Sequence, residues 1–215
     1  QIVHEGDVTL PAGSDGRYIG MKEGKGYIIP GSTSLHVFDT ATRTITNSYT
    51  GLPAAGDFTY PVGNMIISAG QSGRNLCAVI PYQTAPDTQG PKVDFSSPAD
   101  RSVQQAATSR IGLIMSDQIS VASLSTSTFI VRPLGSTTAL TGTYSTQMGS
   151  VNFSPTTPLA ANTIYEVILP VGGVKDAVGN GLREEFRMRF STGPSVDDTN
   201  LNLVSKYPLD ETTGT

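Results

Sequence analysis

The segment Glu185-Phe-Arg-Met-Arg-Phe-Ser191 alternates large apolar side chains with charged ones, residue by residue. Successive side chains of a β-strand point to opposite faces, so this pattern predicts a strand with one buried and one solvated face. Further out along the chain, Val151 and Phe153 show the same spacing of two. We therefore predict an antiparallel β-sandwich between Pro91 and Gly193.

Similar short segments follow one another at intervals of roughly ten residues, with Gly, Pro, Asn and Asp between them. We predict strands near residues 91–97, 109–116, 127–133, 138–144, 150–154, 163–171 and 185–191. Seven short strands in about 100 residues are typical of the immunoglobulin-type sandwich. The predicted core comprises Phe95, Leu113, Phe129, Val131, Phe153, Val167, Phe186 and Phe190.

A tyrosine near the start of the sixth predicted strand supports this fold class. Tyr165 follows the corner Leu159-Ala-Ala-Asn-Thr-Ile. In a tyrosine corner the hydroxyl group hydrogen-bonds back to the backbone a few residues upstream. We expect Tyr165 to make that bond.

Five segments of this region resemble the bacterial Ig-like domains of the S-layer-protein type. They are Asp87-Thr-Gln-Gly-Pro-Lys-Val93, Ser97-Pro-Ala-Asp100, Leu159 to Val167, Gly173-Val-Lys-Asp-Ala-Val-Gly-Asn180 and Phe190-Ser-Thr-Gly193. The segment Met115-Ser-Asp-Gln-Ile119 departs from the family, which usually has a Phe and then an acidic residue and Met. The resemblance implies a spacer or adhesive module without an active site.

Composition agrees with many short strands and turns. The 215 residues include 23 Gly, 14 Pro and no Trp, and only 15% are charged. The net charge of −4 is the opposite of the positive charge expected of a nucleic-acid-binding protein. No apolar run reaches the length of a membrane span. The single Cys77 excludes an internal disulfide framework and is interpreted as a buried apolar residue. Because the first residue is Gln1, either a signal segment was removed or the sequence starts within a longer protein.

The N-terminal residues 1–84 contain a weak internal repeat. Gly6-Asp-Val-Thr-Leu-Pro11 recurs fifty positions later as Gly56-Asp-Phe-Thr-Tyr-Pro61, and each copy precedes two apolar segments. A period of 40–50 residues is typical of propeller blades, and Leu35 to Ile45 resembles the blade hairpin of YVTN and kelch-like propellers. We expect either the last blades of a propeller or a small β-domain with a duplicated hairpin. Chance similarity in a turn-rich sequence is the third possibility.

The C-terminal residues 195–215 combine a polar linker with the start of another module. Leu203 to Thr215 resembles the first strand of a laminin-G-like, concanavalin A-type lectin domain, which opens with an aromatic-Pro-Leu-Asp-Glu-Thr-x-Gly string. The resemblance implies a glycan-binding domain further along the chain. The predicted fold is therefore all-β: a propeller-blade-like domain over 1–84, an Ig-like sandwich over 85–194, and the tail.

Motifs that carry catalytic chemistry are scarce. His4 and His36 are the only histidines, and His36 alternates with apolar residues in a predicted strand, which favours a structural role. Gly20 to Gly26 has the wrong glycine spacing for a phosphate loop and is interpreted as a hairpin turn. We predict no catalytic site, no cofactor site and no enzymatic activity.

Acidic residues near the ends of the sandwich form the one constellation that could bind a ligand. Asp87, Asp100, Asp176 and Asn180 are the candidates for calcium, and Asp197 and Asp198 lie in the exit linker. Oxygen ligands of this kind bind calcium, although no complete calcium loop is present. The alternative is that Asp and Asn occur here because they bond their own backbone in turns.

Two function classes remain open. The first is a non-catalytic segment of a large extracellular, cell-surface or virion protein, which spaces or presents a binding domain for glycans or a surface protein. The second is an accessory segment of a secreted polysaccharide-active enzyme whose active site lies outside these residues. Other domains of the same protein are the expected partners, and neither nucleic acid nor a membrane span is expected.

Overall fold

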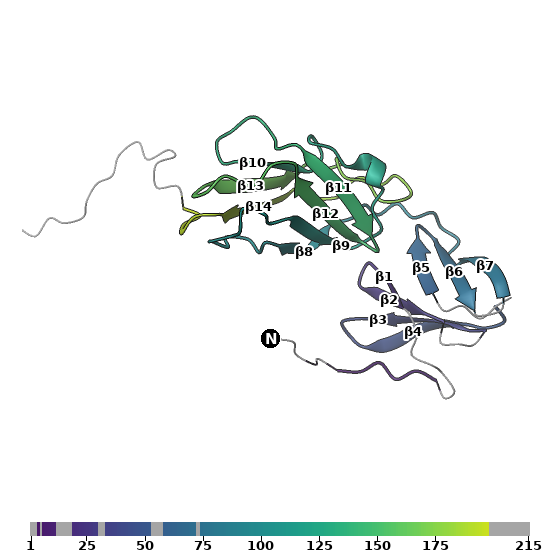
Figure 1. Ribbon diagram of the computed structural model, residues 1–215. Helices are drawn as coiled ribbons and strands as arrows, with labels where there is room; N and C mark the ends of the chain where they lie inside the picture. Colours follow the sequence, from purple (N-terminus) through teal and green to yellow (C-terminus); the bar gives the residue numbers. More distant parts are fainter. Residues whose placement is uncertain are drawn as a thin grey trace, which may run out of the picture.

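The computed structural model describes residues 4, 6–11, 19–29, 33–52, 58–71 and 74–197 (Figure 1). Within these residues the fold is all-β, as predicted, with antiparallel sheets and one short 3-10 helix, η1, at Val121–Ser123. Residues 203–215, for which the sequence predicts the start of a lectin-like domain, lie outside the described residues, as does Asp198. The side chain of Cys77 is also outside them, although its backbone belongs to β7.

Two sheets form the Ig-like sandwich. The first has the order β11-β12-β9-β8 and the second the order β10-β13-β14. The strands are β8 (Val93–Ser97), β9 (Ile111–Met115), β10 (Ile130–Pro133), β11 (Gly142–Gln147), β12 (Ser150–Pro155), β13 (Ile164–Leu169) and β14 (Phe186–Ser191). Each corresponds to one of the seven predicted strands. The largest difference in position is at β11, which begins at Gly142 rather than near residue 138.

The alternating residues supply the core between the two sheets. Leu113, Phe129, Val131, Phe153, Val167 and Phe190 are buried as predicted, and Phe186 packs against them while partly exposed. The prediction for Phe95 was wrong, because its side chain is 61% exposed. A β-bulge between Val93 and Phe95 places Phe95 opposite Ile114, which points outward.

After β8 the chain leaves the first sheet and runs parallel to β14. The Arg101 N–H donates to the Arg189 carbonyl (2.7 Å), and the Ser191 N–H donates to the Ser102 carbonyl (2.9 Å). The Gln105 N–H then donates to the Ser191 carbonyl (3.0 Å). Residues 101–105 therefore join the beginning of the sandwich to its last strand.

The predicted tyrosine corner is present. Tyr165 is buried, and its hydroxyl oxygen accepts a hydrogen bond from the Ala160 N–H at 2.7 Å. Its ring stacks on Phe190 with centroids 5.5 Å apart. The corner thus fixes the loop before β13 to the core.

Replacing Tyr165 by Phe should lower the free energy of unfolding by about 1 kcal/mol, because one hydrogen bond is lost while the ring keeps its packing. Chemical denaturation of the wild type and of Tyr165→Phe measures this difference. Equal stability of the two proteins would contradict a contribution from the hydroxyl.

The N-terminal region consists of two up-and-down meanders. One is the sheet β1-β2-β3-β4, with β1 (Ile19–Lys22), β2 (Lys25–Ile28), β3 (Leu35–Asp39) and β4 (Thr44–Tyr49). The other is the sheet β5-β6-β7, with β5 (Phe58–Val62), β6 (Met65–Gln71) and β7 (Arg74–Pro81). Tyr27, Leu35, Val37 and Ile66 form a second buried core with Ile29 and Leu52.

The repeat takes a different form from the one predicted. The described residues 6–11 contain no strand, so the fifty-residue match between Gly6–Pro11 and Gly56–Pro61 does not relate two strands. Instead β1 and β5 each begin a meander, and Glu23-Gly24 forms the hairpin turn expected between Gly20 and Gly26. The described strands form two open sheets and not a closed propeller.

Candidate functional site at the domain junction

A hairpin of the N-terminal region docks on the Ig-like sandwich. At the turn between β1 and β2, the Glu23 N–H donates to the Ser116 carbonyl at 2.8 Å. The Ser116 hydroxyl donates to Oε1 of Glu23 at 2.7 Å, and Arg183 donates to Oε2 at 2.9 Å. Backbone and side-chain bonds therefore hold the two parts of the chain together.

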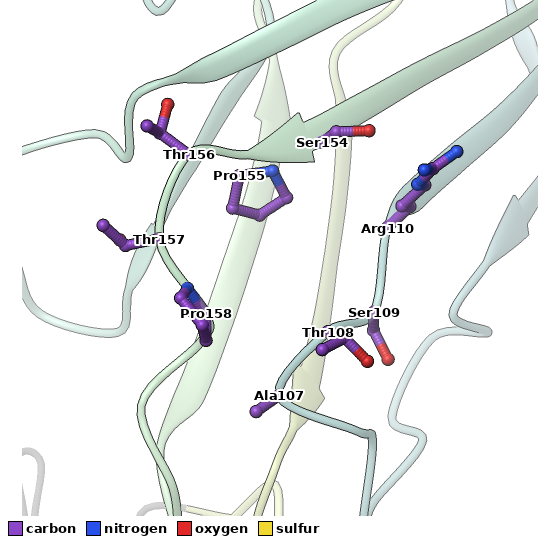
Figure 2. A pocket seen from close by; sticks show the side chains of 9 residues that line it. All are labelled: Ala107, Thr108, Ser109, Arg110, Ser154, Pro155, Thr156, Thr157 and Pro158. Carbon is purple, nitrogen blue, oxygen red and sulfur yellow. The ribbon is translucent and has the colours of Figure 1, made fainter.

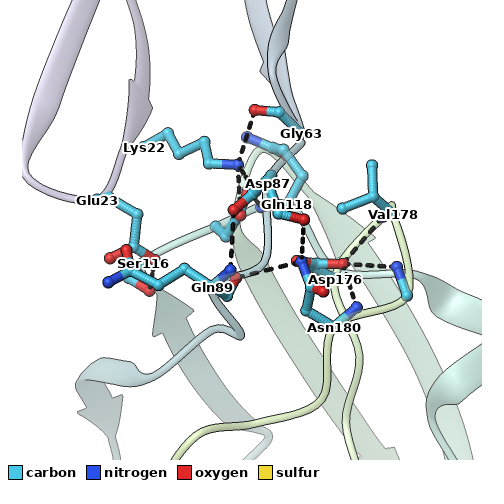
Figure 3. A network of polar contacts seen from close by, with 12 residues as sticks. Lys22, Glu23, Gly63, Asp87, Gln89, Ser116, Gln118, Asp176, Val178 and Asn180 are labelled. Carbon is cyan, nitrogen blue, oxygen red and sulfur yellow. Dashed lines mark hydrogen bonds and ion pairs between the residues drawn. The ribbon is translucent and has the colours of Figure 1, made fainter. Parts of the chain in front are cut away.

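Lys22 lies at the centre of this junction (Figure 3). Its side chain is buried, and its Nζ donates to the Gly63 carbonyl at 3.0 Å. The same ammonium group pairs with Asp117 at 2.8 Å and with Asp87. Lys22 thus belongs to the N-terminal region, while the carboxylates that neutralise it lie in the segment that enters the sandwich and at the end of β9.

A third carboxylate completes the cluster. Oδ1 of Asp176 accepts hydrogen bonds from the N–H groups of Val178, Gly179 and Asn180 at 2.9, 2.7 and 2.8 Å. The Asn180 amide donates to Oδ2 of Asp176 at 2.9 Å and to the Asp87 carbonyl at 3.1 Å. This loop therefore presents Asp176 beside Asp87.

The structure brings together three of the four predicted candidates. One oxygen each from Asp87, Asp117 and Asp176 lie within 4.8 Å of one another, and Asn180 bonds to two of these residues. Asp100 is not part of the cluster, because it accepts the Arg189 N–H (2.9 Å) beside β14. Asp197 is also separate and forms an exposed pair with Arg101.

Sequence reasoning missed Lys22 and Asp117. Asp117 lies in the segment Met115–Ile119, where the sequence departs from the family pattern, and it is almost completely buried. A charged residue directly after a buried strand was the available signal. The sequence around Lys22 contains no comparable signal, because the partners of Lys22 are 65 and 95 positions away.

Burial and ion pairing both act on the pKa values in the cluster. Burial alone would lower the pKa of Lys22, but the hydrogen bonds from its ammonium group to Asp117 and Asp87 raise the pKa above its ordinary value of 10.5. Burial raises the pKa of Asp117, although Lys22 and the Gln118 N–H partly offset this effect and Asp176 adds to it. The pKa of Lys22 is therefore raised by its two carboxylate partners, whereas the pKa of Asp117 is raised mainly by burial.

The donor set suits an ammonium ion better than calcium. Calcium binds six to eight oxygen ligands. Here both oxygens of Asp176 accept N–H donors, and Oδ1 of Asp87 accepts the Gln89 N–H (3.0 Å). The remaining oxygens of Asp87 and Asp117 face Lys22 or the Gln118 N–H. Calcium would have to displace Lys22 to bind between them.

The histidines form no catalytic pair. His4 is exposed and lies 3.0 Å from Asp7, whereas His36 is buried in β3 and bonds to Ser48 at 2.9 Å. His36 therefore has the structural role that its position in the sequence favoured.

A shallow hollow of about 290 Å³ lies between residues 107–110 and 154–158 (Figure 2). Its lining consists of threonine, serine, proline and alanine side chains together with Arg110. A single titratable group cannot supply both an acid and a base, so this hollow offers no acid–base pair.

Comparison with known proteins agrees with the fold of this region. Residues 87–192 match the family model described as bacterial Ig-like domain. The matched region contains all seven strands of the sandwich, so this part of the chain is an Ig-like domain. No curated protein matches the chain.

Two solved structures are similar to about half of the chain. The N-terminal part of the bacterial S-layer protein SbsC is 17% identical with a TM-score of 0.36, covering 49% of this chain and 24% of that one. The S-layer protein rSbsC(31-844) is 16% identical with a TM-score of 0.35, covering 49% of this chain and 14% of that one. The chain therefore spans a quarter or less of the length of these proteins.

Within the described part of the chain, no helix is long and apolar enough to cross a membrane.

Proposed function

We propose that this chain is a non-catalytic structural segment of a modular extracellular or cell-surface protein. In this function the Ig-like sandwich is a spacer, and the N-terminal β-region is held to it in a fixed orientation. The observation that carries the proposal is the burial of Lys22, from one part of the chain, among Asp87 and Asp117 of the other. A solvent-exposed ion pair contributes little to the free energy of folding. A buried ion pair must offset the desolvation of both charges, but it can fix the orientation of the two parts that it joins.

More specifically, we propose that this segment presents a glycan-binding domain. It rests on the sequence of residues 203–215, which resembles the start of a lectin-like module. A spacer that does not bend at its junction would hold such a domain at a constant distance and angle from the parts that precede it.

Backbone NMR relaxation tests the rigid junction. Amides of β1 to β7 and of β8 to β14 should report one shared rotational correlation time in the wild type. The double variant Lys22→Met, Glu23→Ala should give two different values, because both sets of junction contacts are removed. Independent tumbling of the two parts in the wild type would overturn the proposed rigid spacer.

Calcium should leave the wild type unchanged. Because Lys22 occupies the space between Asp87 and Asp117, we expect no shift in the thermal midpoint with calcium up to about 1 mM, the range of weak extracellular sites. In Lys22→Met the same titration should raise the midpoint, because the three carboxylates then lack their cation. Stabilisation of the wild type by calcium would show that the ion displaces Lys22.

A further inference from the structure

Lys22 and Asp87 are placed to react with each other as well as to attract each other. The Lys22 ammonium group donates directly to Oδ2 of Asp87, and the two side chains are only 4% and 8% exposed. An amine and a carboxyl group condense slowly in water, because they must first meet in the right orientation. A fold that holds the reacting atoms in contact raises their effective concentration, in favourable cases to about 10⁵–10⁸ M. The docked chain therefore supplies the proximity that this reaction lacks in solution.

The amine end of the pair is fixed in an aromatic environment. The Gly63 carbonyl accepts a hydrogen bond from Lys22 Nζ at 3.0 Å and another from the Tyr82 hydroxyl at 2.8 Å. The Tyr82 ring packs against Tyr27 with centroids 5.1 Å apart. Because these groups surround a buried amine, bulk water does not compete for its place beside the carboxylate.

The two oxygens of Asp87 have different surroundings. Oδ2 faces Lys22, whereas Oδ1 accepts the Gln89 N–H at 3.0 Å. When a nitrogen adds to Cγ, negative charge develops on an oxygen, and a backbone N–H that already points at this oxygen stabilises that charge. Asp176 lies nearby but is occupied differently, because its oxygens accept N–H donors from its own loop and from the Asn180 amide. Asp87 is therefore the carboxyl group prepared for attack.

Asp117 is placed to move protons between the two reacting groups. Its Oδ2 lies 2.8 Å from Lys22 Nζ, within the range that proton transfer requires. The same oxygen has no other hydrogen-bond donor among the described residues, while the Gln118 N–H donates to Oδ1 at 2.6 Å. Burial raises the pKa of Asp117, so this carboxylate accepts a proton more readily than an ordinary aspartate.

We propose that Lys22 and Asp87 condense into an amide bond between their side chains, with Asp117 as the proton carrier. One proton passes from the Lys22 ammonium group to Asp117, and the free amine then attacks Cγ of Asp87. Asp117 returns its proton to Oδ2, the nitrogen gives a second proton to the same oxygen, and the C–Oδ2 bond breaks. One water molecule leaves with both protons. The charges of Lys22 and Asp87 disappear together, so no further reactant is needed.

This inference rests on the docking contact that supports the proposed function, and it makes that contact permanent. The raised pKa of Lys22 keeps the amine protonated for most of the time, so the bond forms slowly from the ion pair. Stability and titration measurements on Lys22 therefore describe chain that has only just folded. Once formed, an amide between residues 22 and 87 joins the two parts of the chain whatever the pH or the salt concentration.

Mass spectrometry of the intact 215-residue chain tests the proposal. After incubation in native buffer until the mass is constant, the wild type should weigh one water molecule less than its sequence mass of 22.6 kDa. Trypsin should then release residues 18–25 joined to residues 75–92, because a modified Lys22 is no longer a cleavage site. Joining to the peptide that contains Asp117 would overturn the choice of Asp87 as the partner.

Three variants separate the proposed bond from other losses of water. Lys22→Met and Asp117→Asn should both keep the full mass over the same period, the first for lack of the amine and the second for lack of the proton carrier. Lys92→Met, which removes the exposed pair with Asp94, is the control and should lose water like the wild type. Circular dichroism spectra that match the wild type verify that the variants fold.

A wild type that keeps its full mass would overturn the proposal, and so would a loss of water that persists in Lys22→Met. Loss of water from Asp117→Asn at the wild-type rate would contradict the role of Asp117. The rigid junction is judged separately by the NMR relaxation experiment. Full mass with one shared correlation time would refute the bond and leave the rigid spacer standing, whereas full mass with two correlation times would refute both.

Discussion

Truncating Phe129 to Ala should destabilise the Ig-like domain by about 3–5 kcal/mol. Phe129 is fully buried between the two sheets, with Tyr144 and Phe153 as its aromatic neighbours at centroid distances of 5.8 and 6.0 Å. The loss combines the transfer free energy of the ring with the cavity that remains, because a sandwich held by two sheets cannot collapse around it. Urea denaturation followed by circular dichroism measures the effect.

Phe95→Ala is the matched control. The same atoms are removed from a strand of the same domain, but the Phe95 side chain is 61% exposed beside Ile114. The expected change is within about 0.5 kcal/mol, as for other surface substitutions. If the two variants lost equal stability, the assignment of Phe129 to the core and of Phe95 to the surface would be wrong.

Lys22→Met should cost about 3–5 kcal/mol, because removing one partner leaves buried carboxylates without their counter-ion. Met keeps most of the side-chain volume, so the change isolates the ammonium group. Adding Asp117→Asn should restore part of the loss, and the double-mutant cycle gives the coupling between the two groups. Thermal or urea unfolding of the wild type, the two single variants and the double variant measures the four free energies of unfolding.

Lys92→Met is the control for this change. Lys92 pairs with Asp94 at 3.1 Å, but both side chains are more than 40% exposed, so we expect a loss of at most about 1 kcal/mol. Equal losses for the two variants would contradict a special contribution from the junction.

The junction should also respond to alkaline pH. The folded-state pKa of Lys22 is raised, so its contribution is fully present below the ordinary pKa of 10.5 and is lost as pH rises through the folded-state value. The wild type should therefore lose stability relative to Lys22→Met at high pH. A constant difference between the two proteins would show that Lys22 does not titrate in this way.

Much of the sandwich could be predicted because its signals are local. Alternation at Val151–Phe153 and at Phe186–Phe190 identified strands whose inward residues are buried in the structure, apart from Phe186, which is partly exposed. Phe95 could not be assigned correctly, since one bulge reverses the side on which a residue lies and leaves no mark in the alternation. Local patterns therefore give the strands but not each residue's face.

The junction shows a second limit of prediction from sequence, which concerns contacts between distant parts of the chain. The sequence offered Asp176 and Asn180 as two of the calcium candidates, and a hydrogen bond joins them in the structure. The pairing of Lys22 with Asp117 depends on how two parts of the chain dock, which no local pattern encodes. Calcium at Asp87, Asp176 and Asn180 stays a prediction, and the structure places the ammonium group of Lys22 beside Asp87 and Asp117.

The parallel pairing of residues 101–105 with β14 has a consequence for a protein under tension. If the chain is pulled at its two ends, residues 101–105 and β14 are drawn in opposite directions along their shared axis. The hydrogen bonds between Arg101 and Arg189 and between Ser102 and Ser191 are then loaded together in shear rather than opened one after another. The sandwich should for this reason transmit a pulling force along the chain and extend only when these bonds rupture as a group.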